Sequence, residues 1–175
     1  MPQGFPDYYE EKIIMTPLSF LAGDGYRGWA GLTLNAAAWP TANLAMFLPF
    51  ILAEAVTIKR IFVVVSGTGG NIDVGIYDSD GKRLVSLGST AMGAPGAAMS
   101  CDIADTLLPA GRYYLAVAID NIIAVLYGAS GIAGMNTVCG IREMLAAFPL
   151  PALATFAETN TRALIPFVAA TLQAA

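Results

Sequence analysis

The sequence predicts an all-β domain, a β-sandwich or jelly roll, from three observations. Apolar and polar residues alternate with period two over several segments rich in β-branched and aromatic residues, which is the pattern of half-buried strands. Turns rich in glycine and proline, such as GTGGN, SDGK, MGAPGA and LPAGR, separate these segments at short intervals. Roughly eight short strands are expected between these turns, a number that suits two packed sheets, and no long internal repeat or heptad run occurs.

Alternation within the segments indicates which side chains face the core. Segment 43–52 is apolar and extended, and its Pro49 favours an edge or a bulge because proline cannot donate to a strand ladder. Segment 58–67 is apolar on both faces, which is typical of a central or covered strand. In residues 71–78 and 111–120, the expected inward-facing side chains are Ile72, Val74, Ile76, Tyr113, Leu115, Val117 and Ile119. Further strands are expected at residues 82–88, 97–103, 122–127 and 162–169.

The N-terminal residues 1–41 lack a sustained period, so we assign them to an irregular arm and residues 42–175 to the sandwich domain. The arm mixes glycine, proline and apolar residues with Trp29 and Trp39. Such a stretch is either extended and packed on a partner, or a strand folded back on its own sandwich. In both cases the two tryptophans are the expected anchors.

One segment near the C-terminus has a different spacing. Ile141, Met144, Leu145 and Phe148 are three or four residues apart and precede Pro149. This spacing predicts a short helix at 141–148. An apolar loop is the equally weighted alternative.

Charged residues make up only 13% of the chain, about half the usual share. So few charges indicate a membrane protein or a surface that partners cover. Pro49 and Glu54 end the apolar run 44–52 well short of the ~20 residues of a spanning helix. Glycines interrupt the uncharged stretch 121–141 in the manner of strand, turn and strand. We therefore expect no membrane partner and instead expect buried contacts between subunits.

The charge balance and the cysteines exclude further classes of partner. The net charge is −4 without a basic cluster, which argues against nucleic-acid binding. The opening MPQGFPDYYEEK is acidic and contains proline, unlike a signal peptide, so we expect a chain made in the cytoplasm. Cys101 and Cys139 are accordingly expected to be buried thiols rather than a disulfide.

Catalytic chemistry has little support in the residue types. The chain contains no histidine, which removes histidine-dependent triads and histidine metal ligands. The GTGG at 67–70 lacks the Lys-Ser/Thr of a phosphate loop. Paired carboxylates could hydrolyse a glycosidic bond only if two of them faced one groove. We expect no enzyme, no cofactor and no metal.

The stretch GIYDSDGKRLVSLGS, residues 75–89, could be an ion-binding loop or a hairpin turn. Asp78 and Asp80 supply two acids before Gly81, but Lys82 and Arg83 follow and no acid comes until Asp102. A calcium loop needs a third alternate ligand and a later glutamate. Asp-Gly between two alternating segments is instead a strong hairpin signal. Asp78, Asp80 and Gly81 are therefore predicted to form a hairpin turn.

Aromatic residues give two further alternatives. Exposed rings could form a sugar-stacking platform, whereas buried rings would belong to the core or anchor the arm. The alternation favours the core. The six candidates are Tyr77, Tyr113, Tyr114, Tyr127, Trp29 and Trp39.

Two longer motifs carry a family resemblance. NIDVGIYDSDGKRLVSLGST is followed by CDIADTLLPAGRYYLAVAIDN, and MFLPF lies upstream of both. Together, across residues 42–128, they resemble a β-sandwich domain that is common among virion proteins of tailed bacteriophages. Similar strands occur in tail, fibre and capsid-surface proteins, so the resemblance implies a virion location more than a specific role. It brings no catalytic residues.

From this resemblance we expect a non-enzymatic virion structural protein. The resemblance implies a capsid decoration or cement protein that is a homo-oligomer, expected to be a trimer, and that binds the major capsid protein or another virion protein by contact area. The alternative is a receptor- or carbohydrate-binding module of a tail or fibre. The residues expected at the oligomer or capsid contact, on strand faces opposite the core or in the arm, are Phe47, Pro49, Phe62, Val64, Trp29 and Trp39. The first four could equally belong to the core of a second sheet.

Overall fold

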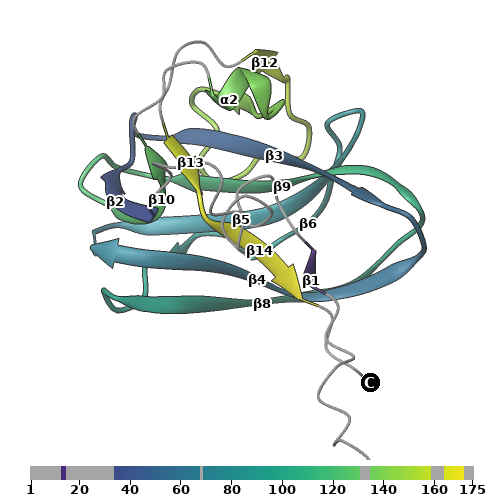
Figure 1. Ribbon diagram of the computed structural model, residues 1–175, viewed down its shortest axis with the longest axis horizontal. Helices are drawn as coiled ribbons and strands as arrows, with labels where there is room; N and C mark the ends of the chain where they lie inside the picture. Colours follow the sequence, from purple (N-terminus) through teal and green to yellow (C-terminus); the bar gives the residue numbers. More distant parts are fainter. Residues whose placement is uncertain (1–12, 15–33, 68, 131–134, 159–163, 172–175) are drawn as a thin grey trace, which may run out of the picture.

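The computed structural model describes residues 13–14, 34–67, 69–130, 135–158 and 164–171. They form a β-sandwich of two antiparallel sheets with one short helix, α2 (Met135–Val138) (Figure 1). The predicted all-β class is therefore confirmed. No helix in this part of the chain is both long and apolar enough to cross a membrane.

The first sheet, sheet A, is built around one long central strand. This strand, β4 (Val56–Gly67), pairs along its length with β8 (Ala97–Leu108), and on its other side with β14 and β10. The prediction of a central strand at 58–67 is confirmed. The remaining strands of sheet A are β1 (Ile13–Ile14), β2 (Leu34–Ala38), β10 (Val125–Ser130), β13 (Leu164–Pro166) and β14 (Val168–Thr171).

The second sheet, sheet B, runs in the order β12 (Ala157–Glu158), β11 (Arg142–Met144), β3 (Leu44–Leu52), β9 (Gly111–Ile119), β5 (Asn71–Asp78) and β6 (Arg83–Ser86), with β7 (Thr90–Ala91) on β5. Its centre is β9, between β3 and β5. Pro49 lies beyond Phe47, the last β3 residue paired with β11. Pro49 thus occupies a stretch of β3 that pairs with no described strand on that side, as expected of an edge proline.

The main core fills the space between the sheets. Every side chain predicted to face inward from residues 71–78 and 111–120 is buried in it. Ile61, Val63 and Val65 of β4 enter the same core from the opposite sheet. Alternation read from the sequence therefore identifies the inner faces of β5 and β9 in sheet B correctly.

A second apolar cluster covers the outer face of sheet B. Phe47, Tyr77 and Tyr114 point away from the main core and pack with Leu150 and Ala154. The covering residues belong to the stretch 145–156, which we call the cover segment. Because of this segment, both faces of β5 and β9 are buried.

The short helix predicted at 141–148 is not formed. Arg142–Met144 is strand β11, which pairs with β3 and β12, and a turn at Leu145 and Ala146 follows. The apolar residues at helical spacing instead serve different purposes. Ile141 enters the main core, whereas Met144 and Phe148 pack against the second cluster.

Parts of the predicted N-terminal arm belong to sheet A. Ile13–Ile14 pairs with β14, and Leu34–Ala38 pairs with β10. Trp39 is buried in the main core, where its Nε1 donates to the Leu44 carbonyl over 3.2 Å. In these residues the chain follows the alternative of a strand folded back on its own sandwich. Trp29 lies outside the described residues.

Candidate interaction surface on the outer face of sheet A

The two sheets differ in what covers their outer faces. The cover segment is held on sheet B by main-chain hydrogen bonds, Arg83 N to Ala152 O over 2.9 Å and Ala154 N to Gly81 O over 2.7 Å. The Tyr77 hydroxyl also donates to Pro151 O over 2.5 Å. Residues of the same chain therefore cover the outer face of sheet B.

A buried carboxylate fixes the centre of the cover segment. Asp73 is fully buried on β5, where its Oδ1 accepts from Gly88 N and its Oδ2 from Leu150 N, each over 2.9 Å. Burial raises the pKa of Asp73, although both hydrogen bonds and the nearby Arg83 oppose that rise. Arg83 itself donates from Nη1 to the Leu150 carbonyl. Asp73 thus joins three separate parts of the chain.

The outer face of sheet A carries partly exposed apolar side chains on its central strand. Phe62 and Val64 alternate with the buried Ile61, Val63 and Val65, so they point outward. Phe62 lies between Ser100 of β8 and Ala169 of β14, and Val64 lies beside Ala98. Such small neighbours cannot cover a phenyl ring.

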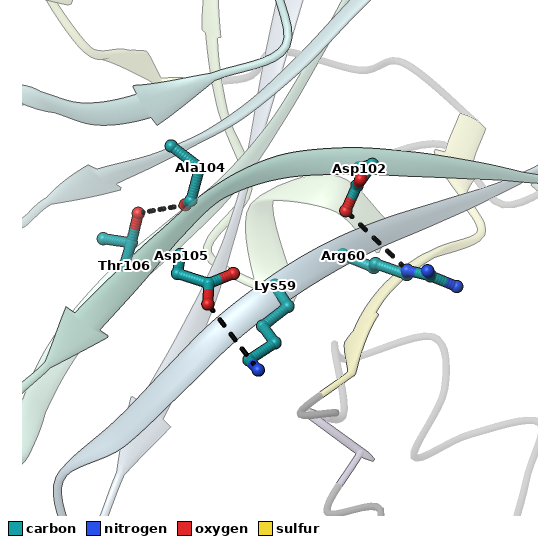
Figure 2. Close-up of polar contacts among 6 residues, drawn as sticks. All are labelled: Lys59, Arg60, Asp102, Ala104, Asp105 and Thr106. Atoms are coloured by element: carbon teal, nitrogen blue, oxygen red, sulfur yellow. Dashed lines mark hydrogen bonds and ion pairs between the residues drawn. The ribbon is translucent and has the colours of Figure 1, made fainter. Parts of the chain in front are cut away.

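Ion pairs lie at one end of this face, where β4 and β8 are irregularly paired between Ile58 and Arg60. Figure 2 shows Lys59 and Arg60 reaching from β4 to carboxylates on β8. Lys59 Nζ lies 3.6 Å from an oxygen of Asp105, and Arg60 Nε lies 3.8 Å from an oxygen of Asp102. Both carboxylates are exposed, so these pairs add little to stability and leave charges available at the rim.

These four charges were not among the residues predicted from the sequence. Period-two alternation places Asp102 on the outer face of its strand, but the register that brings it to Arg60 depends on pairing across forty residues. An apolar centre with a charged rim is the usual anatomy of a protein–protein interface.

The residues predicted at an oligomer or capsid contact are dispersed in the structure. Phe62 and Val64 lie together on the outer face of sheet A, whereas Pro49 is partly exposed on sheet B. Phe47 and Trp39 are enclosed by the chain's own residues. Phe47 packs in the second cluster beneath the cover segment, and Trp39 packs in the main core.

The predicted turn residues connect β5 to β6, and Asp78 is the last residue of β5. Asp78 Oδ1 accepts from Asp80 N over 3.0 Å and from Lys82 N over 2.9 Å, and Gly81 has a φ of 83°. The carboxylate of Asp78 is therefore used to hold the turn. Among the described residues, no group of three or more His, Cys, Asp or Glu could hold a metal.

Replacing Gly81 by alanine is expected to lower the free energy of unfolding by more than about 2 kcal/mol. The new Cβ would lie 2.3 Å from the Ala154 carbonyl oxygen of the cover segment, at a positive φ. Gly88→Ala is the matched control, because its φ is 81° but nothing lies within 4 Å of the new Cβ. Urea unfolding of both variants measures the difference. Equal destabilisation would show that the cover segment does not pack on the turn.

The aromatic residues considered for sugar stacking are mostly enclosed. Tyr77, Tyr113 and Tyr114 are buried, and Tyr127 is partly exposed on β10. Tyr114 packs at 4.6 Å between ring centroids on Phe156 and lies under the Arg112 guanidinium. The described part of the chain therefore presents no platform of adjacent exposed rings.

The two cysteines are free. Burial raises the pKa of Cys101 to about 11, with a smaller contribution from Asp73, and burial also raises the pKa of Cys139. Both thiols stay protonated at neutral pH and are poor nucleophiles.

The chain is therefore an antiparallel β-sandwich of two sheets. Its own residues 145–156 cover the outer face of sheet B, whereas the outer face of sheet A presents the partly exposed Phe62 and Val64. No family model and no curated protein matches the sequence. Among solved structures, the chain is similar to one in "Structure of infectious bursal disease virus Gt strain", at 10% identity and a TM-score of 0.35. The alignment covers 98% of this chain and 45% of that chain. So low a TM-score does not define a common fold.

Proposed function

We propose that this chain is a non-enzymatic structural protein of a bacteriophage virion, a capsid decoration or cement protein that acts as a homotrimer. Its subunits associate through the outer face of sheet A. The trimer stabilises the shell by bridging neighbouring capsid subunits, through contact area rather than chemistry.

The observation that carries this proposal is the contrast between the two outer faces. Sheet B is covered by residues 145–156, whereas sheet A presents Phe62 and Val64 among small neighbours, with charges at the rim. The resemblance of residues 42–128 to β-sandwich domains of phage virion proteins supports the virion as the location of this chain. The enclosure of Tyr77, Tyr113 and Tyr114 supports contact by area over glycan binding.

Placing a lysine at Val64 or Phe62 is expected to reduce the mass in solution from three chains to one. An ammonium group at the centre of a buried contact would have to be desolvated without a partner, which costs several kcal/mol. Multi-angle light scattering of Phe62→Lys and Val64→Lys measures the mass, and circular dichroism checks that each variant folds. Leu84→Lys is the matched control, since Leu84 is an aliphatic residue on sheet B with 38% exposure.

Co-sedimentation with empty heads of the phage that encodes the chain tests the role itself. A trimer that sediments with heads and raises their resistance to heat supports the proposal. A monomer that does not sediment with heads contradicts the proposal. A glycan array would then test the alternative of a receptor-binding module.

A further inference from the structure

Several loops meet at one end of the sandwich, the end to which the arrowhead of β4 points (Figure 1). Main-chain hydrogen bonds join them: Trp39 N to Ala124 O over 2.8 Å, Asn43 N to Ile119 O over 2.9 Å, and Ala147 N to Asn43 O over 2.7 Å. We call this end the loop platform, defined by residues 39–43, 87–96, 120–124 and 145–147.

The loop 87–96 and the loop 120–124 are tied through the start of β5. Asp120 accepts from the main-chain and side-chain nitrogens of Asn71, each over 2.9 Å, and Asn71 pairs with Ala91. The Asn121 amide donates to Gly69 O over 2.8 Å, while its oxygen accepts from the main chain of Ala124. These bonds give the platform a fixed shape before it binds anything.

The platform is nearly free of charge and exposes large aliphatic side chains. Asp120 is the one ionisable residue in the four loops as described. Desolvation alone would raise its pKa, but the hydrogen bonds from Asn71 and Asn121 outweigh it and lower the pKa, so the group stays ionised and partnered. Ile122, Ile123 and Leu145 are 58%, 68% and 62% exposed.

The opposite end of the sandwich has a different character. Its turns carry Glu54, Asp80 and Lys82, and Asp78 ends β5 there. Arg112, the second residue of β9, is exposed at the same end. Exposed aliphatic residues also occur at that end, but among charges. The low charge of the loop platform is therefore a property of one end and not of the whole surface.

We infer that the loop platform is the surface that docks on the shell, against an uncharged apolar patch of another protein. This inference rests on the proposed function and adds the part of the chain that makes the attachment. Three exposed aliphatic side chains on preorganised loops bind by burial of apolar area, with little ordering cost and no charge to desolvate except Asp120.

A lipid surface fits the platform less well. Peripheral membrane attachment relies on lysine and arginine beside exposed aromatic and aliphatic side chains. The four loops have no lysine or arginine, and their single aromatic residue, Trp39, is buried in the core. Their one charge, Asp120, would be repelled by anionic lipid.

The test compares two double variants in sedimentation with empty heads. Ile122→Asp with Leu145→Asp places two carboxylates in the platform, and the expected result is binding weakened about 100-fold or more. Ile51→Asp with Leu153→Asp is the matched control, because these residues are 79% and 64% exposed at the other end. The control is expected to bind within about twofold of the wild type. Ile123 is left unchanged because its side chain lies against Gly69.

Each outcome separates this inference from the proposed function. If the unmodified chain does not sediment with heads, the proposed function fails. If it sediments and the platform variant binds equally well, the platform inference is overturned and the proposed function stands. Binding of the unmodified chain to phosphatidylcholine vesicles, or loss of the trimer in the platform variant, would also overturn the inference. Binding that persists from about 50 to 500 mM NaCl supports an apolar contact, whereas its loss contradicts one.

Discussion

Replacing Phe47 by alanine is expected to lower the free energy of unfolding by about 3–5 kcal/mol. Its ring is fully buried on the outer face of sheet B. It meets Tyr77 edge-on at 5.1 Å and Phe156 at 5.0 Å between ring centroids. The substitution removes the centre of the second cluster, which the cover segment cannot refill because main-chain hydrogen bonds hold it in place. Chemical denaturation measures the loss.

Phe62→Ala is the matched control for Phe47, because both are phenylalanines on outer sheet faces at positions paired with a strand on each side. Phe62 is partly exposed, so its removal should cost the isolated subunit less than about 1.5 kcal/mol. Light scattering adds the second readout. We expect Phe62→Ala to weaken self-association and Phe47→Ala to leave it intact. The reverse pattern would mean that the cover segment is displaced from sheet B in solution and that Phe47 meets a partner.

The strands could be predicted because the alternation that marks a strand depends only on residues that are close together in the sequence. Alternation at Ile72, Val74 and Ile76 needs only the period of a strand and the fact that one face is buried. The same argument fails at Phe47 and Tyr77. A period-two pattern shows that two faces differ, but it does not show that a distant segment covers the second face.

The segment 141–148 illustrates why its residue spacing could not decide between a short helix and an apolar loop. Its apolar residues have helical spacing by coincidence, since Ile141 faces the main core and Met144 the second cluster. Pairing of β11 with β3 decides the conformation, and such non-local pairing outweighs local periodicity. The ion pairs of Lys59 and Arg60 were unpredictable for the same reason, because they depend on register across the sheet.

Replacing Asp73 by alanine is expected to destabilise the fold by about 1–3 kcal/mol for each of the two buried N–H groups left without an acceptor. Those groups belong to Gly88 and Leu150. Asp73→Asn keeps one acceptor oxygen and should cost less. The loss should be concentrated in the cover segment, so hydrogen exchange of the Leu150 amide should rise more than exchange in β9. An equal rise in hydrogen exchange at Leu150 and in β9 would contradict a role of Asp73 that is confined to the cover segment.

The pH dependence of Asp73 supplies an independent measurement. Its pKa in the folded protein is raised above 3.8, so the folded state binds the proton more tightly than the unfolded chain. The contribution of Asp73 to stability is therefore fully present below the unfolded pKa and falls as pH rises through the folded pKa. Subtracting the unfolding free energy of Asp73→Asn from that of the wild type removes the other carboxylates from the comparison. We expect this difference to decrease with rising pH from about 4 upward, because the ionised carboxylate must stay buried under the cover segment. A difference that increases with pH would show that the hydrogen bonds from Gly88 and Leu150 outweigh the desolvation of the buried charge.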